Sequence, residues 1–316
     1  MKKTNIIRYI IASVVLSASC LQMQAAEDEL VVSSFNVRND TNTSDAAAGN
    51  GWSKRYPHIA NMILFHDLDI IGTQECVEHQ VQNLLSCMPG YNYIGVGRND
   101  GGTSGEYSAI FYKEDKFELI DTGNFWLSDT PDVPGKGWDA DQTRICTWGH
   151  FRVISTGFEF FFFNLHLDHR GANSRIYSSE LVLYKIEELA KNQPVIVTGD
   201  FNLTQFSDSY KVLEESCIVK DSYNLAGIRY APNGTMSDFN INNTTIGRID
   251  HIFVTPDQLE VKRYGILTDN YWDDPNEGQE GTTSGNFPQN IEYKETKART
   301  LSDHYPVVSV LKYEVE

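Results

Sequence analysis

VIVTGDFN, residues 195–202, begins as an apolar run and ends with a carboxylate and an amide, Asp200 and Asn202. The three β-branched residues at its start predict a buried strand. Side chains two residues apart in an extended chain point to the same side, so we expect Asp200 and Asn202 to face one ligand. A strand end of this kind is typical of an active site and equally typical of a turn, and the rest of the chain has to distinguish the two.

The same arrangement recurs along the chain. Predicted strands over 29–36, 68–75, 159–166, 248–254 and 301–310 carry, toward one end, the polar residues Asn36, Glu75, Asn164, His166, Asp250, Asp303 and His304. Any one of these alone is more typical of a cap, a turn or a satisfied core polar group. Their recurrence predicts that the strand ends converge on a polar pit in an apolar scaffold. A pit rich in oxygen donors, without a sulfur motif, suits a hard cation such as Mg²⁺ or Mn²⁺.

The remaining elements predict an α/β fold of two packed sheets. Helices are predicted over 53–66, 78–88 and 174–191, further strands over 107–112 and 145–153, an ordered surface loop over 125–144 and a long polar loop over 268–300. Strands alternate with helices early and dominate later, which favours sheets covered by helices. The four phenylalanines at 160–163 are interpreted as part of a core strand. No repeat or domain boundary is visible, so we expect residues 27–316 to form a single domain.

The net charge narrows the class of ligand. The chain carries a formal charge of −17, and its first 26 residues hold three basic residues and no acid, so a chain without them carries −20. Non-specific binding to long nucleic acid is driven by basic surfaces, and a long duplex is therefore not expected as a partner. The charge weighs less against a small phosphate ester bound beside a metal cation, because the cation sets the local field.

Residues 1–26 have the pattern of a signal peptide. Lys2 and Lys3 precede an apolar run, and the small residues Ala25 and Ala26 offer a cleavage point. We therefore expect export to the periplasm, the outer surface or the medium. Lipidation at Cys20 is the alternative, although Ser17 stands where such a signal carries Leu. The apolar run is too short for a membrane anchor, so no membrane insertion is expected apart from that lipid.

Four cysteines remain when Cys20 is set aside, namely Cys76, Cys87, Cys146 and Cys217. None has the close spacing of metal ligands. We interpret them as buried free thiols, while export leaves disulfides open.

Six motifs in order, SFN (34–36), IIGTQE (70–75), NLHLD (164–168), TGDFN (198–202), RIDHIFV (248–254) and LSDH (301–304), resemble those of the endonuclease/exonuclease/phosphatase superfamily, which includes DNase-like nucleases, inositol-polyphosphate phosphatases and deadenylases. The resemblance covers residues 30–311. It implies a four-layer, DNase-like sandwich of two packed, mostly antiparallel sheets flanked by helices. It also implies hydrolysis of phosphodiester or phosphomonoester bonds by in-line attack of an activated water, with a divalent metal.

Carried over position by position, the resemblance implies a role for each polar strand end. Glu75 would bind the metal with Asn36 beside it, and Asp303 would contribute to a metal site. Asp200 would orient or deprotonate the attacking water, and Asn202 would hold a phosphate oxygen.

Two histidines have implied carboxylate partners. His304 would lie next to the scissile phosphate as a base or a charged stabiliser, held in one tautomer by Asp250. His166 would bind phosphate, with Glu106 of GEYSAIFY (105–112) as its partner.

Three further residues are candidate substrate contacts. The planar fork of Arg144 suits phosphate oxygens, and a surface ion pair is the alternative. Asn164 lies in the same predicted strand as His166, and Arg175 lies beside the motifs.

One position departs from the superfamily pattern. The apurinic-site endonucleases of the superfamily usually have an acidic residue two positions after the Asn of the SFN motif, whereas this chain has Arg38 there. The chain thus lacks one possible metal ligand and gains a cation able to face substrate. GVGRNDG (95–101), GEYSAIFY, FWLSDTP (125–131) and TRICTW (143–148) are similar to exported bacterial members of undefined substrate.

The leading hypothesis is an exported Mg²⁺- or Mn²⁺-dependent phosphoesterase that acts, as a monomer, on a small or medium phosphorylated molecule. A secreted nuclease is the alternative within the class, and the lack of a basic stripe weighs against it. Alternatives of another class are a non-catalytic glycan-binding module and a glycoside hydrolase that uses Glu75 and Asp200 as paired carboxylates.

Overall fold

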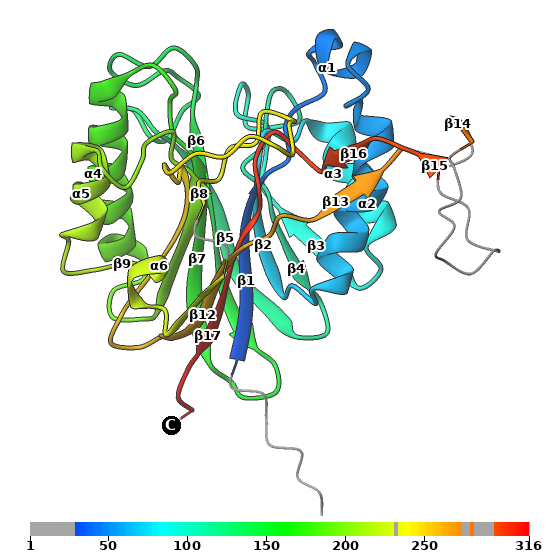
Figure 1. The fold of residues 1–316 in the computed structure, drawn as a ribbon. Helices are drawn as coiled ribbons and strands as arrows, with labels where there is room; N and C mark the ends of the chain where they lie inside the picture. The colour runs from blue at the N-terminus through cyan, green and yellow to red at the C-terminus, as the bar shows by residue number, and fades with distance from the viewer. Residues whose placement is uncertain (1–28, 231–232, 274–278, 281–293, 316) are drawn as a thin grey trace, which may run out of the picture.

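The computed structural model describes residues 29–230, 233–273, 279–280 and 294–315 (Figure 1). The signal peptide predicted for residues 1–26, with Cys20, lies outside these residues. No helix in the described part of the chain is both long and apolar enough to cross a membrane.

Two sheets stand face to face at the centre of the molecule (Figure 1). The first has the strand order β10 (Ile228–Tyr230), β12 (Glu260–Ile266), β17 (Val307–Lys312), β1 (Glu29–Asn36), β2 (Ile70–Gln74), β4 (Ile110–Lys113) and β3 (Tyr91–Ile94). The second has the order β5 (Phe117–Trp126), β6 (Ile145–Val153), β7 (Glu159–His166), β8 (Val195–Asp200), β11 (Asp250–Val254) and β9 (Lys220–Asp221). Only the pairs β1–β2, β10–β12 and β7–β8 are parallel among those described in these two sheets.

Helices cover the outer face of each sheet, which makes four layers (Figure 1). Helices α2 (Trp52–Phe65) and α3 (Glu78–Cys87) cover the first sheet, and α4 (Ala172–Leu189) and α5 (Asp208–Glu214) cover the second. Two short helices, α1 (Thr43–Ala47) and α6 (Ser222–Leu225), lie between strands in the chain. The predicted sandwich is confirmed.

The run of four phenylalanines explains how the second sheet is buried on both faces. Phe160 and Phe162 pack between the sheets with Ile70 and Ile196, whereas their neighbours Phe161 and Phe163 pack toward α4. Side chains alternate between the faces of a strand, so a strand covered on both sides reads as one continuous apolar run. The core-strand interpretation is confirmed.

A polar contact joins the sheets where β2 meets β7. A side chain at Gly72 would overlap Thr198 and Asn164, so the close approach requires glycine. The Asn164 side-chain amide donates to the carbonyl oxygens of Thr73 (2.8 Å) and Ala109 (2.9 Å), and its oxygen accepts from Gln74 Nε2 (2.7 Å). Buried polar groups are stable only when they are bonded in this way.

Topology brings the polar strand ends to one edge of the sandwich. β1 and β2 run parallel, so Asn36 and the residue after β2, Glu75, end side by side. β7 and β8 do the same for His166 and Asp200. β11 is antiparallel to β8, and its first residue, Asp250, therefore pairs with Asp200. β17 is antiparallel to β1, which places the loop before it, with His304, at the same edge.

Several element predictions need correction. The strands β3, β5 and β12 were not predicted, and β5 extends into the segment expected to be a loop from residue 125. The strand predicted from 301 begins at Val307, because 301–306 form the loop that carries Asp303 and His304. The polar segment 268–300 contains β13 (Asn270–Trp272) paired with β16 (Ala298–Thr300), and β14 (Gln279–Glu280) paired with β15 (Lys294–Glu295). Residues 274–278 and 281–293 of that segment lie outside the described part.

The four cysteines named above are free thiols, as interpreted, but only two are buried. Cys76 and Cys146 lie in the core, Cys87 is half-buried and Cys217 is exposed.

Candidate active site

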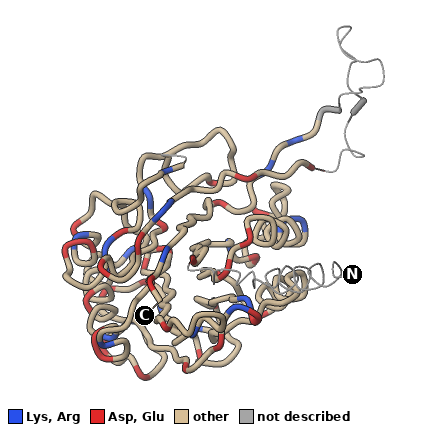
Figure 2. The backbone as a smooth tube through the Cα atoms, turned by 90° about the horizontal axis from the view of Figure 1, so that it is seen from below, with Lys and Arg blue, Asp and Glu red and all other residues tan. Residues whose placement is uncertain are grey.

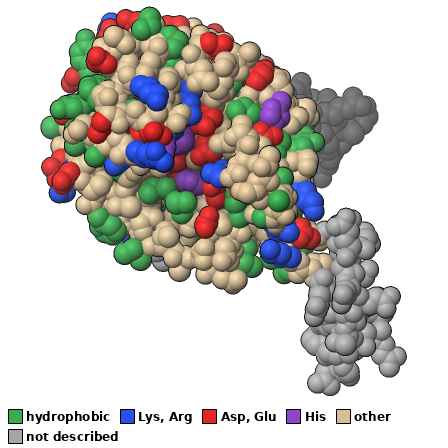
Figure 3. All heavy atoms as spheres, turned by 90° about the horizontal axis from the view of Figure 1, so that it is seen from above, with side chains coloured by type: hydrophobic (Ala, Val, Ile, Leu, Met, Phe, Trp, Pro, Cys, Tyr) green, Lys and Arg blue, Asp and Glu red, His purple; other side chains and the backbone are tan. Residues whose placement is uncertain are grey.

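A pocket of about 470 Å³ opens at the edge where the strand ends meet. In the view from above, acidic and histidine side chains gather in a hollow in the middle of the face, with Lys and Arg side chains beside it (Figure 3). The pocket is lined by Arg38, Glu75, Arg98, Glu106, Gln142, Arg144, His166, His169, Asp200, Asn202, Met236, Ile249, Asp303 and His304. Eight of the predicted site residues are therefore brought together here, and Asn36 and Asp250 lie directly behind them.

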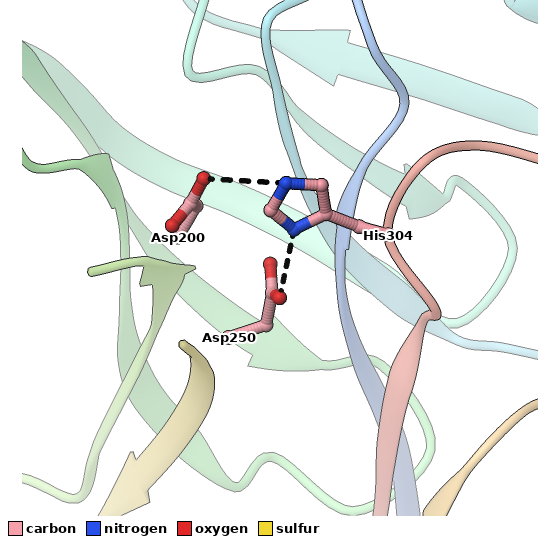
Figure 4. Close-up of side chains that lie close together, drawn as sticks. All are labelled: Asp200, Asp250 and His304. Atoms are coloured by element: carbon pink, nitrogen blue, oxygen red, sulfur yellow. Dashed lines mark hydrogen bonds and ion pairs between the residues drawn. The ribbon is translucent and has the colours of Figure 1, made fainter. Parts of the chain in front are cut away.

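His304 and Asp250 form a buried pair (Figure 4). His304 Nδ1 lies 2.9 Å from Asp250 Oδ2, and Nε2 lies 3.9 Å from Asp200 Oδ2. Burial alone would lower the pKa of His304, but the carboxylates of Asp250, Asp200 and Asp303 raise it well above its usual value. The pair therefore favours a protonated imidazole whose Nε2 faces the pocket.

Asp200 ends β8 beside Asp250 and is almost fully buried. Its Oδ2 accepts from Asn36 Nδ2 (3.0 Å) and its Oδ1 accepts from the backbone N–H of Asn202 (2.9 Å). Burial, together with the charge of Asp250, raises the pKa of Asp200 to about 7. A carboxylate with such a pKa can exchange a proton near neutral pH.

Asn202 reaches the pocket through a turn rather than along an extended strand. Its φ is 49°, in the left-handed region, and its side-chain amide donates to the carbonyl oxygen of Leu167 and to His166 Nε2, both at 3.0 Å. The expectation that Asp200 and Asn202 share a side because the chain is extended is wrong, since the strand ends at Asp200.

Glu75 and Asn36 lie at the ends of the first sheet's parallel pair. Glu75 has a φ of 68°, and its Oε1 accepts from Asn36 Nδ2 (2.9 Å). Its Oε2 accepts from the backbone N–H and the side-chain amide of Asn39 (3.0 and 2.8 Å). Burial opposes ionisation, but these hydrogen bonds lower the pKa of Glu75, so it remains a carboxylate.

Asp303, in the loop before β17, also lines the pocket. Its Oδ1 accepts from Ser302 Oγ (3.1 Å), and its Oδ2 lies 3.3 Å from Arg38 NH1. Burial, with the charge of Glu75 also contributing, raises the pKa of Asp303 even though His304 and Arg38 lower it.

His166 is held neutral between two arginines. Burial, then the charges of Arg144 and Arg98, lower its pKa well below the usual value. Because Asn202 Nδ2 donates to Nε2, the ring proton is placed on Nδ1, which has no hydrogen-bond partner among the described residues. Glu106 Oε2 lies 3.9 Å from that Nδ1, too far for a hydrogen bond, and instead bonds Arg98 NH1 at 2.5 Å. The predicted Glu106–His166 pair is thus a Glu106–Arg98 pair beside His166.

Arg144 lies in the pocket wall as predicted for a phosphate contact. It is only 4% exposed. Its Nε lies 3.4 Å from Asp168 Oδ2 and its NH2 lies 3.1 Å from His169 Nδ1, while NH1 has no partner among the described residues. The alternative of a surface ion pair is wrong, because this arginine is buried.

Asn164 and Arg175 do not reach the pocket. Asn164 is fully buried between the sheets, where its amide is used as described above. Arg175 donates to the carbonyl oxygen of Asp168 (2.8 Å) and supports the loop behind Arg144. Both substrate-contact predictions are corrected to structural positions.

Arg98, Gln142 and His169 line the pocket but were not predicted. Arg98 lies in GVGRNDG, and His169 follows NLHLD by one residue, so each lies next to a motif. No periodicity pointed to them, because all three lie outside the strands and helices.

The donor set fits a divalent cation that prefers oxygen ligands. Glu75, Asp200 and Asp303 converge on one pocket, and burial with neighbouring carboxylates raises the pKa values of two of them. Asp200, Asp250 and His304 also offer donor atoms within 4.8 Å of one another, but His304 and Asp250 already bond each other. The Glu75 side of the pocket is therefore the better place for an ion.

Comparison with known proteins agrees with this geometry. A profile of the Endonuclease/Exonuclease/phosphatase family matches residues 33–304. The chain is 49% identical to a Bacteroides thetaiotaomicron protein of that family (TM-score 0.83, 90% of this chain and 98% of that one). It is 50% identical to a mannosyl-6-phosphatase from the same species (TM-score 0.81, 90% of this chain and 100% of that one).

Two further comparisons are with more distant proteins. The first shows a similar fold, and the second matches only part of the relative's length. The human Nocturnin catalytic domain shares 18% identity with a TM-score of 0.65, over 90% of this chain and 94% of that one. Among curated relatives, uncharacterized protein L388 of Acanthamoeba polyphaga mimivirus is 31% identical over 48% of this chain, and the match spans 59% of its own length.

The family profile, the two solved structures and the converging strand ends lead to one conclusion. The chain belongs to the endonuclease/exonuclease/phosphatase family and is a phosphoric ester hydrolase.

Proposed function

We propose that the chain is an exported, Mg²⁺- or Mn²⁺-dependent phosphatase that hydrolyses a phosphomonoester of a sugar. The observation that carries the proposal is the pairing of the Asp250–His304 couple with the carboxylates of Asp200 and Glu75 in one pocket. The 50% identity to a mannosyl-6-phosphatase over that protein's whole length supports the sugar phosphate. The signal-peptide pattern of residues 1–26 supports export.

Three arginines in the pocket lining favour a monoester. A phosphomonoester carries close to two negative charges at neutral pH, and Arg38, Arg98 and Arg144 line the pocket. In the described part of the chain, Lys and Arg positions are interspersed with Asp and Glu positions along the backbone (Figure 2).

Each residue then has a chemical task. Arg144, whose NH1 has no partner among the described residues, binds a non-bridging phosphate oxygen. Both amide hydrogens of Asn202 are donated to Leu167 and His166, so Asn202 positions His166 instead of holding the phosphate. A divalent ion held by Glu75, with Asn36 beside it, would neutralise phosphate charge. Asp200 takes a proton from the attacking water as the P–O bond to the sugar breaks. His304, kept protonated by Asp250, gives a proton to the leaving sugar oxygen, so the products are the free hydroxyl and inorganic phosphate.

The test is phosphate release by the chain lacking residues 1–26. Mannose 6-phosphate, p-nitrophenyl phosphate and bis-p-nitrophenyl phosphate are compared with Mg²⁺, with Mn²⁺ and with EDTA. We expect metal-dependent turnover of the monoesters that falls by about 10²–10⁴-fold in His304→Ala. His66→Ala, which removes a histidine paired with Asp269 away from the pocket, is the matched control.

Two results would count against the proposal. Faster turnover of the diester, or of plasmid DNA, would indicate a phosphodiesterase or nuclease. Phosphate release that persists in EDTA would remove the metal from the proposal.

A further inference from the structure

Arg38 is held in the pocket by its own backbone. It follows β1 with a φ of 60°, a left-handed conformation that a non-glycine residue adopts only under constraint. Its N–H donates to Asn36 Oδ1 (2.9 Å), and its carbonyl oxygen accepts from Arg55 NH2 and Gln80 Nε2, both at 3.1 Å. The position of the side chain is therefore built into the end of the strand.

The Arg38 guanidinium bridges two carboxylates beside Glu75. Its Nε donates to Asp45 Oδ2 (2.9 Å), and NH1 lies 3.3 Å from Asp303 Oδ2. The Asp303 side chain is 9% exposed and the Arg38 side chain 28%. Because the planar Arg38 guanidinium contacts Asp45 through Nε and Asp303 through NH1, its positive charge has a fixed position.

Asp303 and Glu75 are consequently in different states. Both Asp303 oxygens are used, one by Ser302 and one by the arginine. Among the described residues, the Glu75 carboxylate accepts hydrogen bonds from the amides of Asn36 and Asn39 and forms no salt bridge. The electrostatic attraction for a divalent ion is therefore strongest at Glu75 and weakest at Asp303.

We propose that Arg38 takes the place of a second metal ion, so that the pocket binds one divalent ion, at Glu75, and Asp303 anchors the arginine instead of the metal. The proposal rests on the phosphatase function above and specifies its metal content. A fixed guanidinium repels a cation placed next to it, and it supplies the positive charge that a second ion would bring to the phosphate.

The number of bound ions is the test. Mn²⁺ is titrated into the chain lacking residues 1–26, and free Mn²⁺ is counted by electron paramagnetic resonance. We expect one ion per chain in the wild type and in Arg38→Lys. Glu75→Gln weakens binding by more than about tenfold, whereas Asp303→Asn retains the ion.

Removing the guanidinium charge gives the sharpest readout. Arg38→Gln is expected to bind a second Mn²⁺, because Asp303 is then an unpaired carboxylate beside Glu75, and the double variant Arg38→Gln/Asp303→Asn returns to one. Arg170→Gln makes the same change in net charge at an exposed arginine and is expected to bind one ion. Thermal unfolding of each variant checks that it is folded.

Three results would overturn the inference. They are two ions in the wild type, loss of the ion in Asp303→Asn to the extent seen in Glu75→Gln, and a single ion in Arg38→Gln. Two ions with normal phosphate release would refute this inference alone, whereas no Mn²⁺ binding and no release of phosphate would refute the proposed function as well.

Discussion

Three residues of the pocket, Arg38, Glu75 and Asn202, have φ values of 60°, 68° and 49°. Such conformations cost non-glycine residues about 1–3 kcal/mol each. Each of them is the point where the chain leaves a strand and turns over the edge of the sandwich, and each is held by side-chain hydrogen bonds. At the scale of the residue, these backbone conformations reduce stability locally, and they direct the side chains of the three residues into the pocket.

The state of His304 depends on one buried carboxylate, which leads to a prediction. Asp250→Asn keeps the size of the side chain and an acceptor for Nδ1 but removes the charge that raises the pKa of His304. We expect that pKa to fall and turnover to decrease by about 10²-fold or more. Titration of the imidazole signal by NMR in EDTA, alongside kinetics, measures both.

His66→Ala serves again as the control for the NMR assignment, since His66 pairs with Asp269 on the surface. An unchanged His304 pKa in Asp250→Asn would show that this carboxylate does not hold the proton in place.

Among elements, a buried polar network fastens the edge of the second sheet. Asp221, at the end of β9, lies 3.0 Å from Arg248 NH1 and accepts from the Tyr210 hydroxyl (2.9 Å), with His251 Nδ1 at 3.3 Å. Burial opposes its ionisation, yet His251 and Arg248 lower the pKa of Asp221 from 3.8 to about 2. The network joins β9, β11 and the helix α5.

This shift predicts a pH-dependent contribution to stability. A carboxylate with a lowered folded-state pKa stabilises the protein above its unfolded-state pKa, and the contribution is lost as the pH falls from about 4 toward 2. Asp221→Asn should therefore lower the free energy of unfolding by about 2 kcal/mol at pH 7, and by less below about pH 4. Urea denaturation at pH 7, 5 and 3.5 measures the difference.

Asp208→Asn is the matched control, because Asp208 is exposed and, in the described part of the chain, forms its ion pair with Lys211 one helical turn away. A wild-type–Asp221→Asn difference that stays constant at every pH would show that the loss comes from packing and not from charge.

For the whole molecule, the pocket concentrates negative charge that an ion would relieve. Carboxylates of Glu75, Asp200 and Asp303 meet in a chain that already carries a formal charge of −17. Binding to the folded state alone raises the free energy of unfolding by about 2.7 kcal/mol when the ion is at about 100 times its Kd. We expect Mg²⁺ or Mn²⁺ to raise the melting temperature, and Glu75→Gln to remove most of the rise.

Scanning calorimetry with and without EDTA measures this effect. Addition of Na⁺ at equal ionic strength controls for general screening of charge. Equal melting temperatures with and without divalent ions would contradict an ion site formed on folding.

Prediction succeeded where a pattern is local. The strands β1, β7 and β8 were predicted with their observed starting residues. β7 and β8 each contain a continuous apolar run, because both faces of these strands are buried. β5 was missed because most of its middle residues are exposed or half-buried and carry no such run.

The site residues were likewise predicted correctly where the pattern is local and incorrectly where the contacts are between distant parts of the chain. Polar residues at strand ends do line one pocket, but Asn164, two residues before His166 on the same strand, lies between the sheets. Its neighbours in space, Thr73 and Ala109, are distant in sequence, so no spacing rule shows that its amide is already used.

The amino-acid sequence alone determined the sandwich of two sheets, its family and the set of polar strand ends, because apolar runs and ordered motifs are local properties of a chain. Tertiary structure decided the partners: Arg98 for Glu106, Arg38 for Asp303, and Asp250 for His304 at 2.9 Å. The last of these agrees with the pair implied by resemblance, and the other two do not follow from any motif. The strength of an ion pair depends on the distance between the charges and on their burial. Both are set only when the strands have packed, so they cannot be derived from the order of residues in the sequence.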